Sequence, residues 1–112
     1  MMGFDRRSLQ RIDVPVELKI IIGSDLVSCI TKNVSRKGMC LDILTSSLKS
    51  GLLDKLDEKV SIYLGNTILY GLIRWYNVED GHYAVGIKLE RGSRGKWWDV
   101  VRPVTEARMA KA

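Results

Sequence analysis

Three arginines near the start of the chain have the type and spacing to bind an anion or a nucleobase. They stand in the stretch RRSLQR, where Arg6 is adjacent to Arg7 and Arg11 follows four residues later. A guanidinium forms paired hydrogen bonds with a phosphate or with the O6 and N7 edge of guanine, and it also stacks on bases. Two such groups at this spacing can close around one ligand, although solvated arms often carry the same pattern.

The stretch NVSRKG, which interrupts two apolar runs, supplies a second set of polar groups. Asn33 and Ser35 are two residues apart at the expected end of a strand, so their side chains point to one sheet face. Both side chains can donate and accept hydrogen bonds. Gly38 lets a ligand approach the backbone, and Arg36 and Lys37 add positive charge. Taken alone, the stretch is also typical of an ordinary turn at the end of a strand.

The other reactive side chains do not form a recognisable catalytic or metal-binding set. His82 is the only histidine of the sequence and stands beside a hairpin turn, where we expect it to be exposed. Cys29 and Cys40 lie in apolar runs, which indicates core residues rather than a disulfide or zinc ligands. We therefore expect no enzymatic activity, no metal and no cofactor.

The totals favour one folded domain with a moderate attraction for anions. The chain has 112 residues, a formal charge of +5 and a pI near 9.4. No apolar run approaches the length of a membrane span, and the first residues carry charges where a signal peptide would be apolar. These features predict a cytoplasmic protein that does not insert into membranes.

Six runs rich in β-branched and aromatic residues predict short antiparallel strands. They cover Val14–Gly23, Leu26–Ser35, Gly38–Thr45, Lys59–Gly65, Asn66–Val78 and His82–Glu90. Strands of this number and length favour an all-β fold, a closed six-stranded antiparallel β-barrel. The Glu79-Asp80-Gly81 segment predicts a hairpin turn with Gly81 at positive φ.

Two segments outside the strands predict helical structure. Leucines recur at helical spacing in SSLKSGLLDKLDEK, which predicts a short helical connection of one or two turns, weakened by Gly51. The segment GSRG at 92–95 is interpreted as a flexible basic link to a short C-terminal helix, because Pro103 argues against a long one. The chain is thus divided into a basic arm (1–13), a barrel (14–91) and a helical tail (92–112).

The two polar stretches together resemble the signature of the PilZ domain family. Residues 7–11 match RxxxR and residues 33–38 match the pattern (D/N)xSxxG, in the family's order and ahead of a small barrel. The stretches NVSRKGMCLDI, GLIRWYNV and YAVGIKL are also similar to strands of the family, so the likeness covers most of residues 6–90. This resemblance implies a bacterial receptor or adaptor domain that binds the second messenger cyclic di-GMP.

The resemblance also implies roles for individual residues. Arg7 and Arg11 would grip guanine edges and phosphates, and Arg6 would add a further contact. Asn33 and Ser35 would bind the other guanine. Asn33 stands where many family members have aspartate and lacks the charge-assisted acceptor that a carboxylate offers.

The remaining residues of the NVSRKG stretch complete this expected site. Gly38 would keep the turn open, and Arg36 would strengthen the positive field. We expect the arm to be disordered without ligand and to close over it, and we expect an unidentified effector protein to receive the signal. Trp97 and Trp98 are candidates for that contact, with at least one expected to pack in the core.

Two other functions compete with the receptor hypothesis. A small basic barrel could bind RNA or single-stranded DNA, but no clear row of aromatic residues for base stacking stands out, which makes nucleic acid the less favoured partner. Alternatively, a PilZ-like domain could act as a protein-interaction module without a ligand. The intact arginines and the complete (D/N)xSxxG pattern argue against that alternative.

Overall fold

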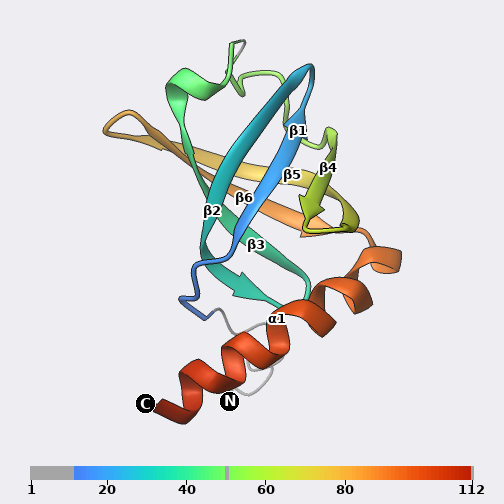
Figure 1. Cartoon of the computed structure of the whole chain (residues 1–112). Coiled ribbons are helices and arrows are strands. Elements are labelled where there is room, and N and C mark those ends of the chain that lie inside the picture. Colours follow the sequence, from blue (N-terminus) through green and yellow to red (C-terminus); the bar gives the residue numbers. More distant parts are fainter. Residues whose placement is uncertain (1–11, 50, 112) are drawn as a thin grey trace, which may run out of the picture.

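The apolar alternation of the sequence builds a closed barrel. The computed structural model describes residues 12–49 and 51–111, and within them six antiparallel strands close in the order β1-β2-β3-β6-β5-β4 (Figure 1). The predicted six-stranded barrel is therefore confirmed. In chain order the elements are β1 (Glu17–Ile22), β2 (Asp25–Ser35), β3 (Gly38–Leu44), the 3-10 turn η2 (Thr45–Ser47), β4 (Lys59–Leu64), β5 (Thr67–Glu79), β6 (His82–Leu89) and α1 (Arg91–Lys111).

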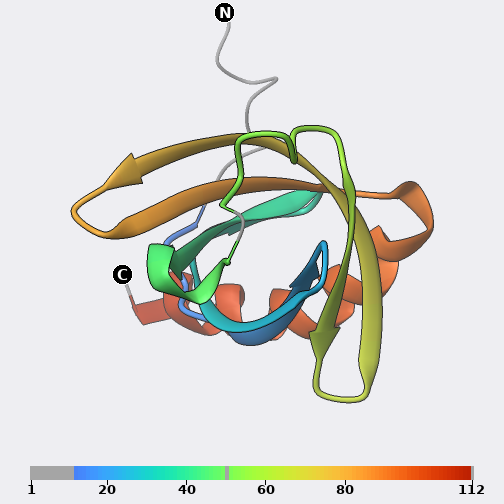
Figure 2. The same ribbon diagram turned by 90° about the horizontal axis from the view of Figure 1, so that it is seen from above.

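The core lies inside the barrel, where the strands curve around a common interior (Figure 2). In β1, Leu18, Ile20 and Ile22 are buried while the residues between them face outward. This period of two is what places polar groups on the outer face of every strand. Closure of the barrel pairs the strand edges that would otherwise bind other chains.

The hairpin between β5 and β6 turns as the sequence predicts. Asp80 has a φ of 48° and Gly81 a φ of 80°. Two consecutive residues in the left-handed region suit the right-handed twist of the flanking strands, and glycine adopts that conformation without steric cost.

The connection between β3 and β4 contains less helix than its leucine spacing predicts. The 3-10 turn at Thr45–Ser47 is the helical element within the described part of this connection. Leu48 and Leu52 are buried, but Leu53 is 86% exposed, so the leucines do not share one buried face. Gly51, with a φ of 67°, is incompatible with a continuous helix at this point.

The C-terminal helix is longer than predicted. It runs without interruption from Arg91 to Lys111, so the prediction of a flexible link at 92–95 is wrong. The helix also continues through Pro103, which lacks one backbone donor. Burial of Trp97 and Val101, one turn apart, stabilises the helix against the barrel and offsets that loss. Trp97 is fully buried, as expected for at least one of the two tryptophans.

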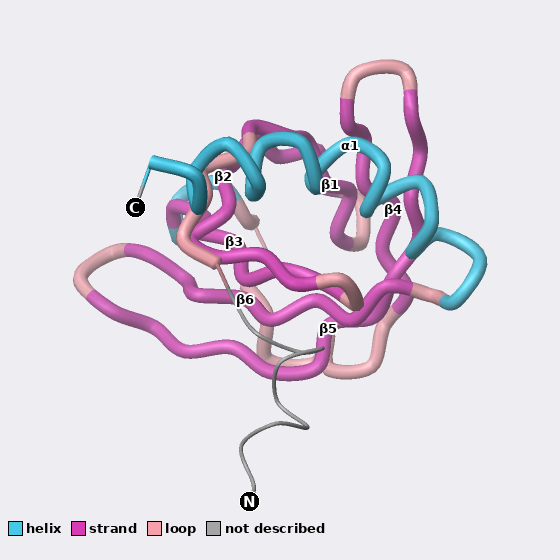
Figure 3. The backbone as a smooth tube through the Cα atoms, turned by 90° about the horizontal axis from the view of Figure 1, so that it is seen from below, coloured by secondary structure: helices cyan, strands magenta, loops and turns pink. Residues whose placement is uncertain are grey.

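Helix α1 lies across one end of the barrel (Figure 3). Ser93 is buried near the start of α1, and its Oγ accepts a 2.9 Å hydrogen bond from the backbone N–H of Tyr70 on β5. Thr105, two turns after Trp97, is also buried. Within residues 12–49 and 51–111, no helix combines the length and the apolar character needed to span a membrane.

The segment that leads into β1 is attached to β2 at two levels. Ile12 and Val34 exchange backbone hydrogen bonds of 2.8 and 2.9 Å. Further along, the buried Thr31 hydroxyl donates to the carbonyl of Val14 at 2.6 Å and accepts from the N–H of Val16 at 2.8 Å. The end of the arm is therefore fixed beside the second half of β2.

Candidate functional site

A row of cross-strand neighbours crosses the outer face of four strands. Asn33 on β2 pairs with Cys40 on β3, Cys40 pairs with Gly86 on β6, and Gly86 pairs with Trp75 on β5. Val34, the next residue of β2, is fully buried, so Asn33 belongs to the outer face. The barrel topology thus brings the NVSRKG stretch and Trp75 onto one continuous surface.

Two glycines allow close packing on this surface. A Cβ atom on Gly38 would overlap the backbone carbonyl oxygen of Ile87, and a Cβ atom on Gly86 would overlap the indole of Trp75. The indole therefore lies against the Gly86 backbone, while 40% of the Trp75 residue remains exposed. An aromatic ring that is fixed by its packing and remains partly exposed provides a surface on which a base can stack.

The surface is hollowed into a positively charged groove, here called the motif groove, with a volume of about 470 Å³. Its lining consists of Ser35, Lys37, Gly38, Arg74, Trp75, Gly86, Ile87 and Lys88. Three of these residues are cations, and among the residues that the structure describes no carboxylate lines the groove. Such a lining attracts an anionic ligand.

Arg74 has one ion-pair partner outside the lining. Its Nε lies 3.7 Å from Oδ1 of Asp57, and both side chains are largely exposed. An ion pair between exposed side chains contributes little to stability. The guanidinium can therefore turn toward a ligand at small cost.

The turn that follows β2 is held from several sides. Ser35 is buried, and its Oγ donates a long 3.5 Å hydrogen bond to the carbonyl of Gly38. The backbone carbonyl of Ser35 accepts a 2.7 Å bond from Nε1 of Trp97, and the carbonyl of Lys37 accepts a 2.8 Å bond from the N–H of Leu89. These contacts fix the backbone on both sides of Arg36.

The structure separates the predicted site residues of this turn. Ser35 and Gly38 line the motif groove, and Asn33, which is half-buried, lies in the adjoining row. Arg36 does not belong to the lining. Its guanidinium carbon instead lies 5.0 Å from the ring centre of Trp98 on α1.

The three predicted arginines, Arg6, Arg7 and Arg11, lie outside the described residues. Their nearest described neighbour is Ile12, which directly follows Arg11 in the sequence. The bonding partner of Ile12 is Val34, the residue between Asn33 and Ser35.

Five lining residues were not predicted from the sequence: Arg74, Trp75, Gly86, Ile87 and Lys88. A signal for two of them exists in the run Ile73-Arg74-Trp75-Tyr76. Ile73 is buried, Tyr76 packs against the core, and the pairing register with β6 shifts between Ile73 and Trp75. Two consecutive polar or amphipathic residues between inward-facing ones indicate a β-bulge, which turns an additional side chain toward solvent.

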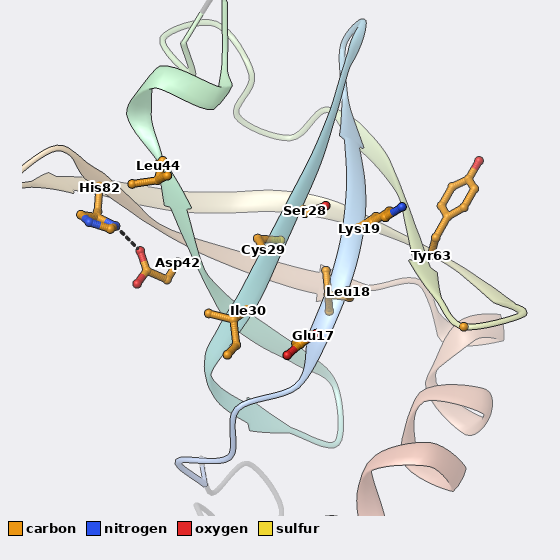
Figure 4. Close-up of a pocket in the computed structure, with 11 residues that line it drawn as sticks. Glu17, Leu18, Lys19, Ser28, Cys29, Ile30, Asp42, Leu44, Tyr63 and His82 are labelled. Carbon is orange, nitrogen blue, oxygen red and sulfur yellow. Dashed lines mark hydrogen bonds and ion pairs between the residues drawn. The ribbon is translucent and has the colours of Figure 1, made fainter.

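A second groove of about 870 Å³ is lined by residues of β1, β2, β3 and β4 and by His82 of β6 (Figure 4). Its lining includes the carboxylates of Glu17 and Asp42 as well as Lys19 and His82. Nδ1 of His82 lies 2.8 Å from Oδ1 of Asp42. The mixed charges make this larger groove a poorer match for an anion than the motif groove.

Cys29 lies half-buried in the wall of the second groove. Burial, together with the charge of Asp42, raises its pKa to about 12. Cys40 is buried and is not part of a disulfide. In the part of the chain that the structure describes, no group of three His, Cys, Asp or Glu residues is arranged to hold a metal ion. His82 is exposed, as its position beside the hairpin predicts.

Comparison with known proteins agrees with the fold and with the family resemblance. Residues 5–97 match the model of the PilZ domain. The crystal structure of the uncharacterised Legionella protein Lpg0364 is similar, with a TM-score of 0.53 and 14% sequence identity, over 89% of this chain and 98% of that chain. At this identity the likeness concerns the fold. No curated protein matches the sequence.

Proposed function

Because this chain belongs to the PilZ domain family, a non-catalytic receptor family known for binding cyclic di-GMP, we propose that it is a cyclic di-GMP receptor that holds its ligand in the motif groove. One observation carries this proposal. The groove contains Ser35 and Gly38 of the family pattern and is lined by three cations, with no carboxylate among the described residues. The charge of the groove therefore matches the two phosphates of the ligand.

The residues of the groove and of the adjoining row divide into groups that suit different parts of the ligand. Asn33 and Ser35 offer hydrogen bonds to the edge of one guanine. Trp75 offers its exposed ring face for stacking on a base, which contributes about 1–3 kcal/mol in nucleic-acid complexes. Lys37 and Lys88 carry the positive charge that the phosphates require.

The arm completes the proposed site. The pairing of Ile12 with Val34 ends the arm next to Asn33 and Ser35. We propose that Arg7 and Arg11 bind the guanine and phosphate groups of the ligand and that Arg6 adds a third cation. Fork-like guanidinium contacts to guanine discriminate between bases by about 1–3 kcal/mol each. A few such contacts, reduced by the cost of ordering the arm, give an expected Kd of about 1 µM.

Output from such a receptor passes to another protein. The PilZ domain family is non-catalytic, so we propose that the signal is a ligand-dependent change of a surface. We propose an effector protein that recognises the chain with its arm closed over the ligand. Assays for this partner should compare its binding to the free and the liganded chain.

Isothermal titration with cyclic di-GMP tests the receptor function directly. Cyclic di-AMP and GTP serve as controls for base and ligand specificity. Arg7→Ala is expected to weaken binding at least tenfold, whereas Arg102→Ala, which removes an exposed arginine of α1, should leave binding unchanged. Absence of binding by the folded wild-type chain would overturn the proposal. Binding to single-stranded oligonucleotides with a steep salt dependence would instead favour a nucleic-acid function.

A further inference from the structure

Helix α1 holds the backbone of the turn that carries the (D/N)xSxxG pattern. Trp97 is fully buried, and its indole Nε1 donates a 2.7 Å hydrogen bond to the backbone carbonyl of Ser35. This bond connects Trp97, which α1 buries against the barrel, to a residue that lines the motif groove. A displacement of α1 at this point must therefore also displace the Ser35 backbone.

A second contact reaches the same turn from the same helix. The Arg36 guanidinium lies over the ring of the half-buried Trp98, at 5.0 Å from its centre, in the geometry of a cation–π interaction. Its neighbours Ser35 and Lys37 line the motif groove, whereas Arg36 does not. Ser35 and Lys37 thus line the groove, whereas Arg36, which stands between them, contacts α1.

We propose that Trp97 and Trp98 are positioning residues for the ligand site, which couple the docking of α1 to ligand binding. The proposal rests on the proposed receptor function for its ligand-dependent part. Trp98 holds Arg36 on the side of the turn that faces α1. Trp97 fixes the backbone carbonyl of Ser35, one of the two lining residues that flank Arg36. Both contacts keep Ser35 and Lys37 directed into the groove before the ligand arrives.

Coupling of this kind acts in both directions. If α1 stabilises the binding-competent turn, the ligand must stabilise the docked helix by the same free energy. A cation–π pair at a partly exposed site corresponds to an effect of about twofold to fivefold on an equilibrium constant. The ligand is therefore expected to slow hydrogen exchange of the α1 amides around Trp97 and Trp98.

Trp98 is the better position for a test, because Trp97 is a core residue whose replacement can unfold the domain. Trp98→Leu removes the aromatic face, and Trp98→Phe retains it. Val104→Ala is the matched control, since Val104 is exposed on the same helix. We expect cyclic di-GMP binding to weaken about twofold to fivefold in Trp98→Leu and to be close to the wild-type value in the other two variants.

A double-mutant cycle with Arg36→Gln separates positioning from direct ligand contact. If Arg36 acts through Trp98, each single variant loses a similar amount of affinity and the double variant loses no more than either. Additive losses would show that Arg36 contacts the ligand itself and would overturn the proposal. Unchanged binding by Trp98→Leu would overturn it as well.

A measurement without ligand keeps the two proposals distinguishable. Backbone order parameters of residues 35–38, measured by NMR in the free protein, should fall in Trp98→Leu but not in Trp98→Phe or Val104→Ala. Unchanged order in Trp98→Leu would reject the positioning role whether or not the chain binds cyclic di-GMP. Failure of the wild-type titration, with the expected loss of order, would reject only the receptor function.

Discussion

Ile12 and Val34 exchange two backbone hydrogen bonds, of 2.8 and 2.9 Å, and so attach the end of the basic arm to the second position of the (D/N)xSxxG pattern. This attachment matters because the two halves of the family signature are separated by a complete strand in the sequence. Ile12, which directly follows the RxxxR half in the sequence, pairs with Val34 of the other half. The fold itself therefore fixes the end of the arm beside the (D/N)xSxxG pattern.

Replacement of Thr31 by valine should destabilise the attachment of the segment that leads into β1. The buried hydroxyl donates a hydrogen bond to the carbonyl of Val14 and accepts one from the N–H of Val16. Valine would leave both backbone groups without this partner. We expect the free energy of unfolding to fall by about 1–3 kcal/mol. Urea denaturation measures the effect, with Thr67→Val in the half-exposed first position of β5 as the control. Equal losses in the two variants would contradict the role assigned to Thr31.

Gly38→Ala should destabilise the barrel through a steric conflict. The new Cβ atom would overlap the carbonyl oxygen of Ile87 on the neighbouring strand, so the β3–β6 pairing must shift. A loss of about 1–3 kcal/mol is expected from denaturation curves. Gly95→Ala is the opposite control, because its Cβ atom meets no neighbouring atom and alanine favours the helix by roughly 0.5–1 kcal/mol. Similar stability of Gly38→Ala and wild type would disprove the close approach.

Lys88→Gln and Lys19→Gln should distinguish the two grooves as ligand sites. Lys88 lines the motif groove and Lys19 lines the groove with mixed charges. We expect the first substitution to weaken cyclic di-GMP binding severalfold and to reduce its salt dependence, because one phosphate contact is lost. The second should have no effect. Titrations at two salt concentrations provide the measurement, and the reverse pattern would place the ligand on the other side of the barrel.

Asn33→Asp should strengthen the binding of cyclic di-GMP. A carboxylate accepts charge-assisted hydrogen bonds from the guanine N1–H and N2–H groups, and such bonds exceed neutral ones by about 1 kcal/mol. The expected gain is roughly fivefold in Kd at moderate salt. Titration with cyclic di-AMP is the control, because adenine lacks these donors. A weaker complex would mean that the position does not face the guanine edge.

Cys29 should make the stability of the protein fall in alkaline solution. Its pKa is raised from 9.0 to about 12, mainly by burial and further by Asp42. Below about pH 9 both states keep the thiol proton, so Cys29 adds no pH dependence there. Above pH 9 the unfolded chain loses the proton while the folded chain keeps it, and the folded state is disfavoured.

The comparison of wild type with Cys29→Ala isolates this effect from other groups that titrate at high pH. Between roughly pH 8 and pH 10, the stability of the wild type should fall by up to about 1 kcal/mol more than that of the variant. Urea denaturation at the two pH values provides the measurement. Parallel curves would mean that the thiol ionises equally easily in both states.

The sequence predicted the barrel well because strand alternation and glycine-containing turns are local signals. Gly81, for example, has the positive φ that its turn requires. The length of α1 was not predictable in the same way. Its stability depends on burial of Trp97 and Val101 against strands distant in the sequence, and this packing outweighs the local effect of Pro103.

The predicted site was incomplete for a similar reason. Asn33, Ser35 and Gly38 could be selected because a linear pattern contains them. Trp75 and Lys88 join them only through the pairing of β3 with β6 and of β6 with β5. Which strands are neighbours in a barrel depends on the topology, and a single sequence does not state it.

The strand order also determines which part of the barrel can open without loss of the site. The β1–β4 junction that closes the ring rests on three residue pairs, whereas β3 and β6 pair along seven. A transient parting of the short junction would convert the ring into a curved open sheet, with the motif groove on the strands that stay paired. Local opening of the barrel at the β1–β4 junction would then not require release of a ligand from the motif groove.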